Sequence, residues 1–568
     1  MKDGPLLLLL SGFVLLISLQ AGANDLQPIP DYGLPIGPPA TFRMPPGSQT
    51  PAPDFLEPLA PGLSGTFESI NFNDNVTLSG YYYIPPDPIA AAGPNHIVAV
   101  VNSAIEWYDK TGTRQYRQSL EDFFASLSLE RWPFDPKVIY DQHAGRFVVV
   151  CLVKVDNGAG SPSNISRLLV AVSDNSDPNG SWYLASINSK LTINSADHWA
   201  DFPGLAVDEE AVYITANMFT FGSGSFGASR LWIVRKGSGT GGFYDGGSLS
   251  YTLHDPSVQA GLSDQSFTMQ PAHILGAGGV APGVGTFLVS ANWNQGANES
   301  LSIIRVDNPL GSPTFTNQFV NLGDIHNGSL VFPDAPQAGT ANLIDAGDRR
   351  ALHAVWRDNS LWVVHTVNPP TGSDAGQATA HWCEIDTVNL SSLSLIEQGN
   401  IGGEDIAPGT HTFYPSIAVD ASGNVGIGFA ASAPTIFPGA YYTGRKASDP
   451  AGRMQPSAAL AAGVDYYIRF FGTTRNRWGD YSGISVDPSD DATFWVFNEY
   501  ALTRGTPISG EDGRWGTRFG RFSFAACEGN LSGNDNDVDG SDLAVLIGNP
   551  GLLNLSIFAE DFGRTGCP

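Results

Sequence analysis

One short pattern recurs through most of this 568-residue chain. In each copy a proline or a small residue leads into a short apolar strand, and an aspartate and a turn separate this strand from a second apolar strand. The clearest copies cover residues 135–152, 202–216, 414–429 and 481–497, and weaker copies begin at Asp87, near Pro271 and at Ala351. Such repetition indicates a fold in which one small unit is copied, here seven times.

The spacing of the copies limits what each unit can be. The anchor prolines at 88, 136, 203 and 271 lie 48, 67 and 68 residues apart, and Pro415 lies 67 residues before Ser482. A segment of that length holds a four-stranded sheet with its loops, and sheets in a ring cover one another's edges. We therefore predict an all-β fold, a seven-bladed β-propeller over residues 64–525. An array of β-sandwiches is the alternative, although it needs separate cores and clearer linkers.

Composition agrees with a turn-rich β fold and narrows the range of partners. The chain has 65 Gly and 40 Pro, and only 15% of its residues are charged. Its 56 acidic and 29 basic residues give a net charge of -27. A phosphate backbone or an anionic membrane surface would repel such a chain, so we expect no nucleic-acid partner.

The N-terminus has the layout of a cleavable secretory signal over residues 1–23. Lys2 precedes an apolar run, and three small residues follow at 21–23. No second segment is apolar for long enough to span a bilayer. We therefore expect a soluble, secreted protein that begins near Asn24 and whose residues 24–63 form a Pro-rich linker. Attachment to a cell surface stays open.

A short acidic loop near the C-terminus predicts a calcium site. Asp535, Asp537 and Asp539 alternate along it, and Asp542 precedes an apolar run at residues 543–547. Calcium takes about six to eight oxygen ligands, and such a loop followed by a helix can supply them. The register that ends on Asp542 places a carboxylate at the twelfth position of an EF-hand-like loop. Its opening ligands are then Asn530 and Ser532, with one extra residue needed in between. An acidic, solvated tail without metal is the alternative.

Residues 535–543, Asp-Asn-Asp-Val-Asp-Gly-Ser-Asp-Leu, resemble the calcium loop of dockerin modules, small secreted units built on EF-hand-like loops. The resemblance covers residues 526–568 and implies a C-terminal α-helical calcium module that attaches the chain to a partner. The second copy, at residues 555–567, has no acidic loop, which argues against a cohesin-like partner. Cys527 and Cys567 bracket the module, and in an oxidising compartment we expect a disulfide to staple so small a unit.

The other two cysteines lie in apolar surroundings. Cys151 is part of an apolar run, and Cys383 follows Trp382. Two buried free thiols or a bridge between them both fit this pattern. No cysteine spacing supports a zinc site.

Parts of the repeated units resemble the blades of sialidase-like propellers found in secreted bacterial proteins. Residues 415–424 have the pattern of a blade's first hairpin, and residues 176–182, Ser-Asp-Pro-Asn-Gly-Ser-Trp, resemble the Asp-box turn of BNR-type repeats. The resemblance implies a propeller. Because no segment meets the Asp-box spacing strictly, sialidase catalysis does not follow from it.

Repetition also separates structural residues from functional ones. A residue that recurs at one place in several units serves the unit, whereas a site in a ring draws different residues from different blades. The aspartates that end the first strands are Asp141, Asp208, Asp420 and Asp487. An aspartate in this place accepts a hydrogen bond from the backbone two residues on, so we expect these four to hold turns.

A cation or histidine followed by tryptophan precedes three of the first strands. The pairs are Arg131-Trp132, His198-Trp199 and Arg477-Trp478, and each is followed by an aspartate, Asp135, Asp201 or Asp480. An aromatic face beside a charged donor and a carboxylate suits a sugar ring, so these pairs are candidate ligand-binding residues and carbohydrate is the expected ligand class. The alternative is that the tryptophans pack between blades and the cations contact their rings.

The three aspartates are also the candidates for catalysis. Glycoside cleavage needs two carboxylates about 5–10 Å apart, and Asp135, Asp201 and Asp480 could converge around the channel. No zinc-protease, serine-hydrolase or phosphate-loop motif is present. We therefore expect a propeller that binds carbohydrate or another extracellular ligand, with a calcium-binding tail for attachment. A glycoside hydrolase or polysaccharide lyase, and an adhesion scaffold with a protein partner, are the alternatives.

Overall fold

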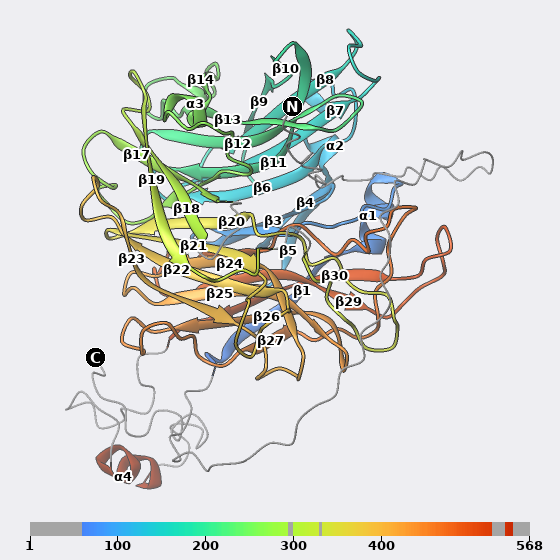
Figure 1. The fold of residues 1–568 in the computed structure, drawn as a ribbon, viewed down its shortest axis with the longest axis vertical. Helices are drawn as coiled ribbons and strands as arrows, with labels where there is room; N and C mark the ends of the chain where they lie inside the picture. Colours follow the sequence, from blue (N-terminus) through green and yellow to red (C-terminus); the bar gives the residue numbers. More distant parts are fainter. Residues whose placement is uncertain (1–59, 293–298, 329–331, 525–539, 549–568) are drawn as a thin grey trace, which may run out of the picture.

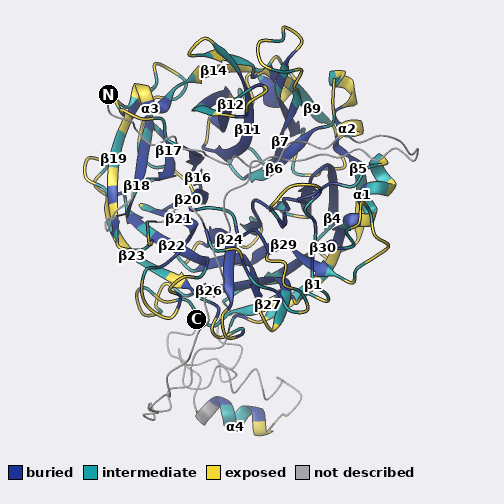
Figure 2. Ribbon diagram, turned by 45° about the vertical axis from the view of Figure 1, so that its right-hand side comes forward, coloured by how far each residue is buried: buried dark blue, intermediate teal, exposed yellow. Residues whose placement is uncertain are grey.

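The computed structural model describes residues 60–292, 299–328, 332–524 and 540–548. Seven sheets in this part of the chain are arranged around a central axis (Figure 1, Figure 2). The propeller predicted from the repeat is therefore confirmed, with seven blades. Outside the described residues lie the predicted signal segment, residues 24–59 of the predicted linker, and Cys527, Asn530, Ser532, Asp535, Asp537, Asp539 and Cys567.

Five blades are four-stranded antiparallel sheets: blades 1, 2, 4 and 6, and blade 7, which is described below. Blade 1 contains β2 (Ile89–Ala92), β3 (His96–Val101), β4 (Ala104–Asp109) and β5 (Arg114–Ser119). Blade 2 contains β6 (Phe134–Asp141), β7 (Arg146–Val155), β8 (Ile165–Ser173) and β9 (Trp182–Asn188). Blade 4 contains β15 (Gln270–Pro271), β17 (Val284–Ala291), β18 (Glu299–Asp307) and β19 (Thr314–Gly323). Blade 6 contains β24 (His411–Val419), β25 (Val425–Ala433), β26 (Ile436–Arg445) and β27 (Ala458–Ala461).

Blades 3 and 5 each have a fifth strand. Blade 3 contains β10 (Leu191–Ile193), β11 (Ala196–Val207), β12 (Ala211–Thr220), β13 (Phe226–Arg235) and β14 (Ser250–His254). Blade 5 contains β16 (His273–Ile274), β20 (Ala351–Arg357), β21 (Ser360–Val367), β22 (Thr379–Asp386) and β23 (Ser394–Ile401). Because β16 follows β15 directly and runs parallel to β20, it ties blade 4 to blade 5.

Blade 7 closes the ring with strands from both ends of the propeller. It contains β28 (Gly483–Val486), β29 (Phe494–Leu502) and β30 (Arg514–Phe522), with β1 (Leu63–Asn71) as its outermost strand. β1 pairs antiparallel with β30, so that Leu63 lies opposite Phe522. The first and last strands thus share one sheet, and neither end of the ring leaves a blade incomplete.

The helices are few and short: α1 (Phe72–Ser79), α2 (Leu120–Phe123), η1 (Ala125–Leu127), η2 (Phe243–Asp245), α3 (Pro256–Gln259) and α4 (Gly540–Gly548). α4 contains the apolar run that was expected to follow the acidic loop. Within the ranges given above, no helix is both long enough and apolar enough to cross a membrane.

The hydrophobic core lies between blades. Val148 and Val150 of blade 2, for example, belong to one buried cluster with Val212 and Ile214 of blade 3. Cys151 lies in the cluster shared by blades 1 and 2, and Cys383 lies in the one shared by blades 4 and 5. Both are buried free thiols, so the free-thiol alternative is confirmed.

The anchor prolines mark β-bulges in the strands that line the channel. Asp135, Phe202 and Tyr414 each precede such a proline and have positive φ angles of 48°, 52° and 50°. The pairing register of β6, β11 and β24 shifts at these positions. Left-handed backbone costs free energy for residues other than glycine, so surrounding contacts must hold each bulge in place.

The four repeated aspartates hold turns, as predicted. Each accepts through Oδ1 a hydrogen bond of 2.8–3.1 Å from the backbone N–H two residues on. The second carboxylate oxygen of Asp141 contacts the next blade. Asp141 Oδ2 lies 2.6 Å from Lys236 Nζ, which also donates to the Asp208 carbonyl oxygen. Because Lys236 follows the blade 3 strand β13, this ion pair joins blades 2 and 3.

Loss of this ion pair should destabilise the propeller markedly. Lys236 and Asp141 are both almost fully buried, and removing one partner of such a pair costs about 3–5 kcal/mol. We expect Lys236→Met to lower the free energy of unfolding by that amount in chemical denaturation. The matched control is Lys190→Met, whose partner Asp197 lies 3.7 Å away at the surface, and it should cost less than about 1 kcal/mol. Equal losses in the two variants would contradict the assignment.

Candidate functional site

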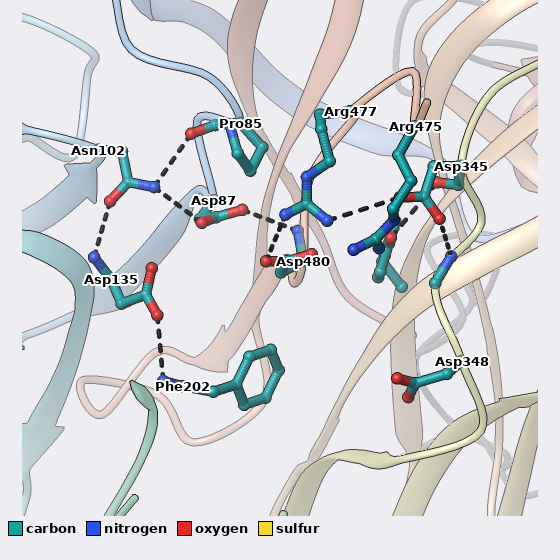
Figure 3. A network of polar contacts seen from close by, with 12 residues as sticks. Pro85, Asp87, Asn102, Asp135, Phe202, Asp345, Asp348, Arg475, Arg477 and Asp480 are labelled. Atoms are coloured by element: carbon teal, nitrogen blue, oxygen red, sulfur yellow. Dashed lines mark hydrogen bonds and ion pairs between the residues drawn. The ribbon is translucent and has the colours of Figure 1, made fainter. Parts of the chain in front are cut away.

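A group of polar residues lies where the channel-lining strands begin (Figure 3). These first strands, β2, β6, β11, β15, β20, β24 and β28, contact one another in ring order. We call the group the polar collar. Its members are the side chains of Asp87, Asn102, Asp135, Asp345, Arg475, Arg477 and Asp480, together with Phe202, which takes part through its backbone N–H. All but Arg475 are buried, so the collar is an internal network and not an open cleft.

One half of the collar links blades through side chains that bond the backbone of the next blade. Asp87 accepts from Asp480 N at 2.7 Å and from Asn102 Nδ2 at 2.8 Å. Asn102 Oδ1 in turn accepts from Asp135 N at 2.8 Å. Asp135 Oδ2 accepts from Phe202 N at 3.1 Å. The bonds run continuously from blade 7 through blades 1 and 2 to blade 3.

The other half is an arginine–carboxylate network. Arg477 Nη2 donates to Asp480 Oδ2 at 2.6 Å, and its Nη1 lies 3.5 Å from Asp345 Oδ2. Arg475 Nε lies 2.5 Å from the same oxygen of Asp345. Nearby, Arg350 makes a bidentate pair with Asp348 at 2.8 and 2.6 Å. These contacts join the loops that lead into blades 5 and 7.

The carboxyl groups of the two halves have pKa values that are shifted in opposite directions. Burial raises the pKa of Asp87 and of Asp135 well above the usual range, and neighbouring carboxylates add to the effect. The pKa of Asp201 rises to about 7 because burial and the charge of Asp480 outweigh the opposing charge of Lys154. Burial would also raise the pKa of Asp345, but the arginines bring it below its usual range. Burial therefore favours the protonated carboxyl in one half of the collar, and the arginines favour the ionised carboxylate of Asp345 in the other half.

The three candidate catalytic aspartates are brought together by the fold. The charge of Asp201 acts on the pKa of Asp135, and the charge of Asp480 acts on both. All three are buried. Among the described residues, Asp135 Oδ1 and Asp201 Oδ1 have no hydrogen-bond partner. Burial raises the pKa of the first two, and Asp480 forms an ion pair with Arg477.

The three candidate aromatic residues lie in different surroundings. Trp199 is 3% exposed, and Lys154 Nζ lies 3.5 Å from its ring centroid. Trp478 is 1% exposed and packs edge-on against Tyr467. Trp132 alone is partly exposed, so it is the one indole of the three with a surface open to a ligand.

The cations paired with these tryptophans divide in the same way. His198 is buried, and its Nδ1 lies 2.8 Å from the Ala196 carbonyl oxygen. Arg477 belongs to the collar. Arg131 is exposed, and its guanidinium carbon lies 3.8 Å from the Trp132 ring centroid.

Several residues of the site were not singled out from the sequence. Asp87 and Asn102 complete the collar. Burial raises the pKa of the nearby Glu499, and the charge of Asp87 adds to that shift. Tyr81 packs 5.5 Å from Trp132. The Asp87-Pro88 dipeptide repeats Asp135-Pro136, so the sequence pattern could have indicated Asp87. Only tertiary contacts reveal Asn102, Glu499 and Tyr81.

The turn that resembles an Asp-box has a structural role. Asp177 Oδ1 accepts from Asn179 N at 3.0 Å, and Trp182 Nε1 donates to the Pro178 carbonyl oxygen at 2.9 Å. Asn179 also accepts from Trp107 Nε1 at 2.9 Å. Because Trp107 belongs to β4, this turn fastens blade 2 to blade 1.

Metal ligands do not gather within the described residues. No group of three His, Cys, Asp or Glu side chains there could hold a metal ion. Of the predicted calcium ligands, only Asp542 belongs to this part of the chain, and it is fully buried in the first turn of α4. The calcium site therefore stays a prediction from sequence.

No family model and no curated protein sequence matches the chain. Among solved structures, a Trypanosoma rangeli sialidase in complex with sialic acid is 10% identical with a TM-score of 0.37, over 76% of this chain and 59% of that one. A putative glycosidase from Bacteroides thetaiotaomicron is 13% identical with a TM-score of 0.28, over 58% and 86%. A xylan β-1,4-xylosidase from Bacillus halodurans is 8% identical with a TM-score of 0.30, over 77% and 98%.

This chain thus spans less than two thirds of the sialidase. The propeller assignment rests on the sheet topology of the chain itself.

Proton retention by Asp201 should make stability depend on pH. Its pKa is raised from 3.8 to about 7 in the fold, so the folded state holds more protons than the unfolded state between these values. The free energy of unfolding must then fall as pH rises from about 4 to 7, by up to about 1.4 kcal/mol per pH unit for one group. We expect Asp201→Asn to show a shallower fall in denaturation curves across that range.

The exposed Asp264 provides the control. Asp264→Asn should keep the pH dependence of the parent protein. If Asp201→Asn also kept it, Asp201 would not be retaining a proton in the folded state.

Proposed function

We propose that this protein is a carbohydrate-binding propeller. The ligand would sit on the face where the channel-lining strands begin, at an aromatic platform formed by Tyr81, Trp132 and Arg131. The single observation that carries the proposal is the pairing of two partly exposed rings from the loops that lead into blades 1 and 2. The centroids of Tyr81 and Trp132 are 5.5 Å apart, with their planes at 43°.

The chemistry of the platform suits a sugar ring. The CH groups of a pyranose stack on aromatic faces, and tyrosine and tryptophan combine an apolar face with a polar edge. The exposed guanidinium of Arg131 lies over Trp132 and carries hydrogen-bond donors for ring hydroxyls or for the carboxylate of an acidic sugar. Loops that reach the surface from two blades can hold these groups in a fixed arrangement.

Binding is favoured over cleavage because the carboxylates lie inside the protein. Hydrolysis of a glycosidic bond requires an acid and a second carboxylate to flank that bond. Asp135, Asp201 and Asp480 are at least nine-tenths buried. The collar bonds of Asp135 and Asp480 also hold neighbouring blades together. A substrate could reach these groups only by opening the collar.

Substitution of the platform should weaken binding without unfolding the chain. We expect Trp132→Ala and Tyr81→Ala each to reduce affinity at least about tenfold, or about 1.4 kcal/mol, for soluble polysaccharides that the parent binds in affinity electrophoresis. Tyr251→Ala, which removes an exposed ring on β14, is the matched control and should bind like the parent.

Two results would count against the proposal. One is absence of binding by the parent across neutral and acidic polysaccharides, which would favour a protein ligand. The other is an equal loss in the Tyr251→Ala control. The masses of the incubated polysaccharides should also stay unchanged, because new oligosaccharides would establish an enzyme.

We also propose that the protein is exported and that residues 526–568 form a calcium module that attaches it to an extracellular partner or surface. The apolar run after the acidic loop lies in a helix, α4, with Asp542 in its first turn. A carboxylate at that end is favoured by the helix dipole, and carboxylate oxygens are ordinary calcium ligands. These features support the register that ends on Asp542.

Calcium binding to the full chain should depend on the acidic loop. Calorimetric titration is expected to show saturable binding that the double variant Asp537→Asn, Asp539→Asn weakens at least about tenfold, because a calcium site loses affinity with each ligand charge removed. Asp358→Asn, at an exposed position in the β20–β21 turn, should bind like the parent. Unchanged binding in the double variant would refute the loop assignment.

A further inference from the structure

The central channel forms a pocket that is closed at one end. Its lining begins just beyond the collar, at Lys137 and Ser482, and extends along the inner strands to Pro488 and Asp491. Along β28 the exposure rises in the same direction, from the buried Gly483 and Ile484 to the partly exposed Ser485 and Val486. The free volume is about 100 Å³. The pocket therefore opens on the face where the inner strands end, opposite the aromatic platform.

Lys137 lies at the closed end without a charged partner. The residue is 7% exposed, and its Nζ lies 3.0 Å from the centroid of the Tyr481 ring. No carboxylate of the described chain lies within ion-pair distance of Nζ, and no hydrogen bond to it is present there. The nearby carboxylates of Asp87 and Asp135 accept instead from Asn102 and from backbone groups. The amine is thus a buried polar group that faces a cavity.

Burial also changes the protonation of this amine. It lowers the pKa of Lys137 from 10.5 to about 7, although the charges of Asp87, Asp135 and Asp480 act in the opposite direction. At neutral pH a large fraction of the side chain is therefore an uncharged amine. A desolvated, neutral lysine is a nucleophile toward carbonyl carbon.

His353 supplies a hydrogen-bond donor in the same pocket. It lies on β20, and its Nδ1 accepts from Ile417 N at 3.3 Å. This bond leaves the proton on Nε2. Burial and the charge of Lys137 lower the pKa of His353 to about 4, so the imidazole is neutral and Nε2–H can donate.

We propose that the channel pocket captures a small aldehyde or ketone as an imine on Lys137. The walls around the amine are largely apolar, with Val138, Leu352 and Ile417 among them. The free volume of about 100 Å³ is several times the roughly 10–15 Å³ that one water needs on the same measure, so it admits a carbonyl compound of a few heavy atoms. An anion is a poorer occupant, because the largely apolar walls would leave its charge without water and the amine is largely uncharged near neutral pH.

The chemistry is balanced without an additional reactant. The neutral amine attacks the carbonyl carbon, a C–N bond forms, and the C=O bond becomes a C–OH group. The oxygen then leaves as water with the two hydrogens that the amine loses, and a C=N bond remains. A donor such as His353 Nε2–H polarises the carbonyl oxygen in the first step and assists departure of the hydroxyl in the second.

Reductive trapping of the full chain tests this inference. The protein is incubated at pH 7 with propanal and cyanoborohydride, and propylation of each lysine is followed by peptide mass spectrometry. Lys190, about a quarter exposed at the surface, is the internal control. An ordinary lysine near pKa 10.4 is about 0.04% neutral at pH 7, so we expect Lys137 to react at least about tenfold faster. Its rate should level off above pH 7, while that of Lys190 continues to rise.

Reaction of Lys137 no faster than Lys190, or with the same pH profile, would overturn the proposal. A second variant tests the route of access. Ile139→Trp adds bulk at a partly exposed position of the pocket wall and should slow propylation of Lys137 without affecting Lys190. Lys137→Met removes the amine and keeps a side chain of similar length at a buried site where the amine is largely uncharged, so it should lose the trapped product while its melting temperature stays close to that of the parent.

Discussion

The ring of blades depends on hydrogen bonds in which a side chain of one blade accepts the backbone N–H of the next. Asn217 repeats for blades 3 and 4 what Asn102 does for blades 1 and 2, since its Oδ1 accepts from Thr268 N at 2.8 Å. The backbone at the bulges departs from the regular ladder, and a buried N–H without a partner is costly. Short acidic and amide side chains satisfy these groups. The cost is that carboxylates such as Asp87 are withdrawn from water, and their raised pKa values follow from that burial.

The sequence revealed those parts of the fold that depend on neighbours along the chain. The turn aspartates were predictable because each bonds a backbone N–H two residues away. The proline spacing was informative because each anchor proline marks a bulge at the start of a channel-lining strand. Together these signals were sufficient for the number of blades. The closure of blade 7 was not among them, because β1 and β30 are separated by the whole propeller.

The candidate site could be predicted only in part, because exposure is decided by other blades. Trp132 and Trp478 occur in the same local pattern of arginine, tryptophan and a following aspartate. Trp478 is enclosed by Tyr467, whereas Trp132 meets Tyr81 at a partly open surface. The aspartates of the pattern converge as their spacing suggested, but nothing local indicates that their oxygens bond a neighbouring blade. The shared motif therefore marks equivalent positions and does not assign them a common role.

The collar and the channel lysine are two consequences of one electrostatic condition. An ionised carboxylate near Lys137 would hold the ammonium form, since opposite charges stabilise each other strongly where water is excluded. Burial raises the pKa of Asp87 and Asp135, so it opposes the ionised form that would stabilise the ammonium group. The amine then loses its proton more readily because it is itself desolvated. The network that fastens the blades therefore also favours an uncharged amine at the closed end of the channel.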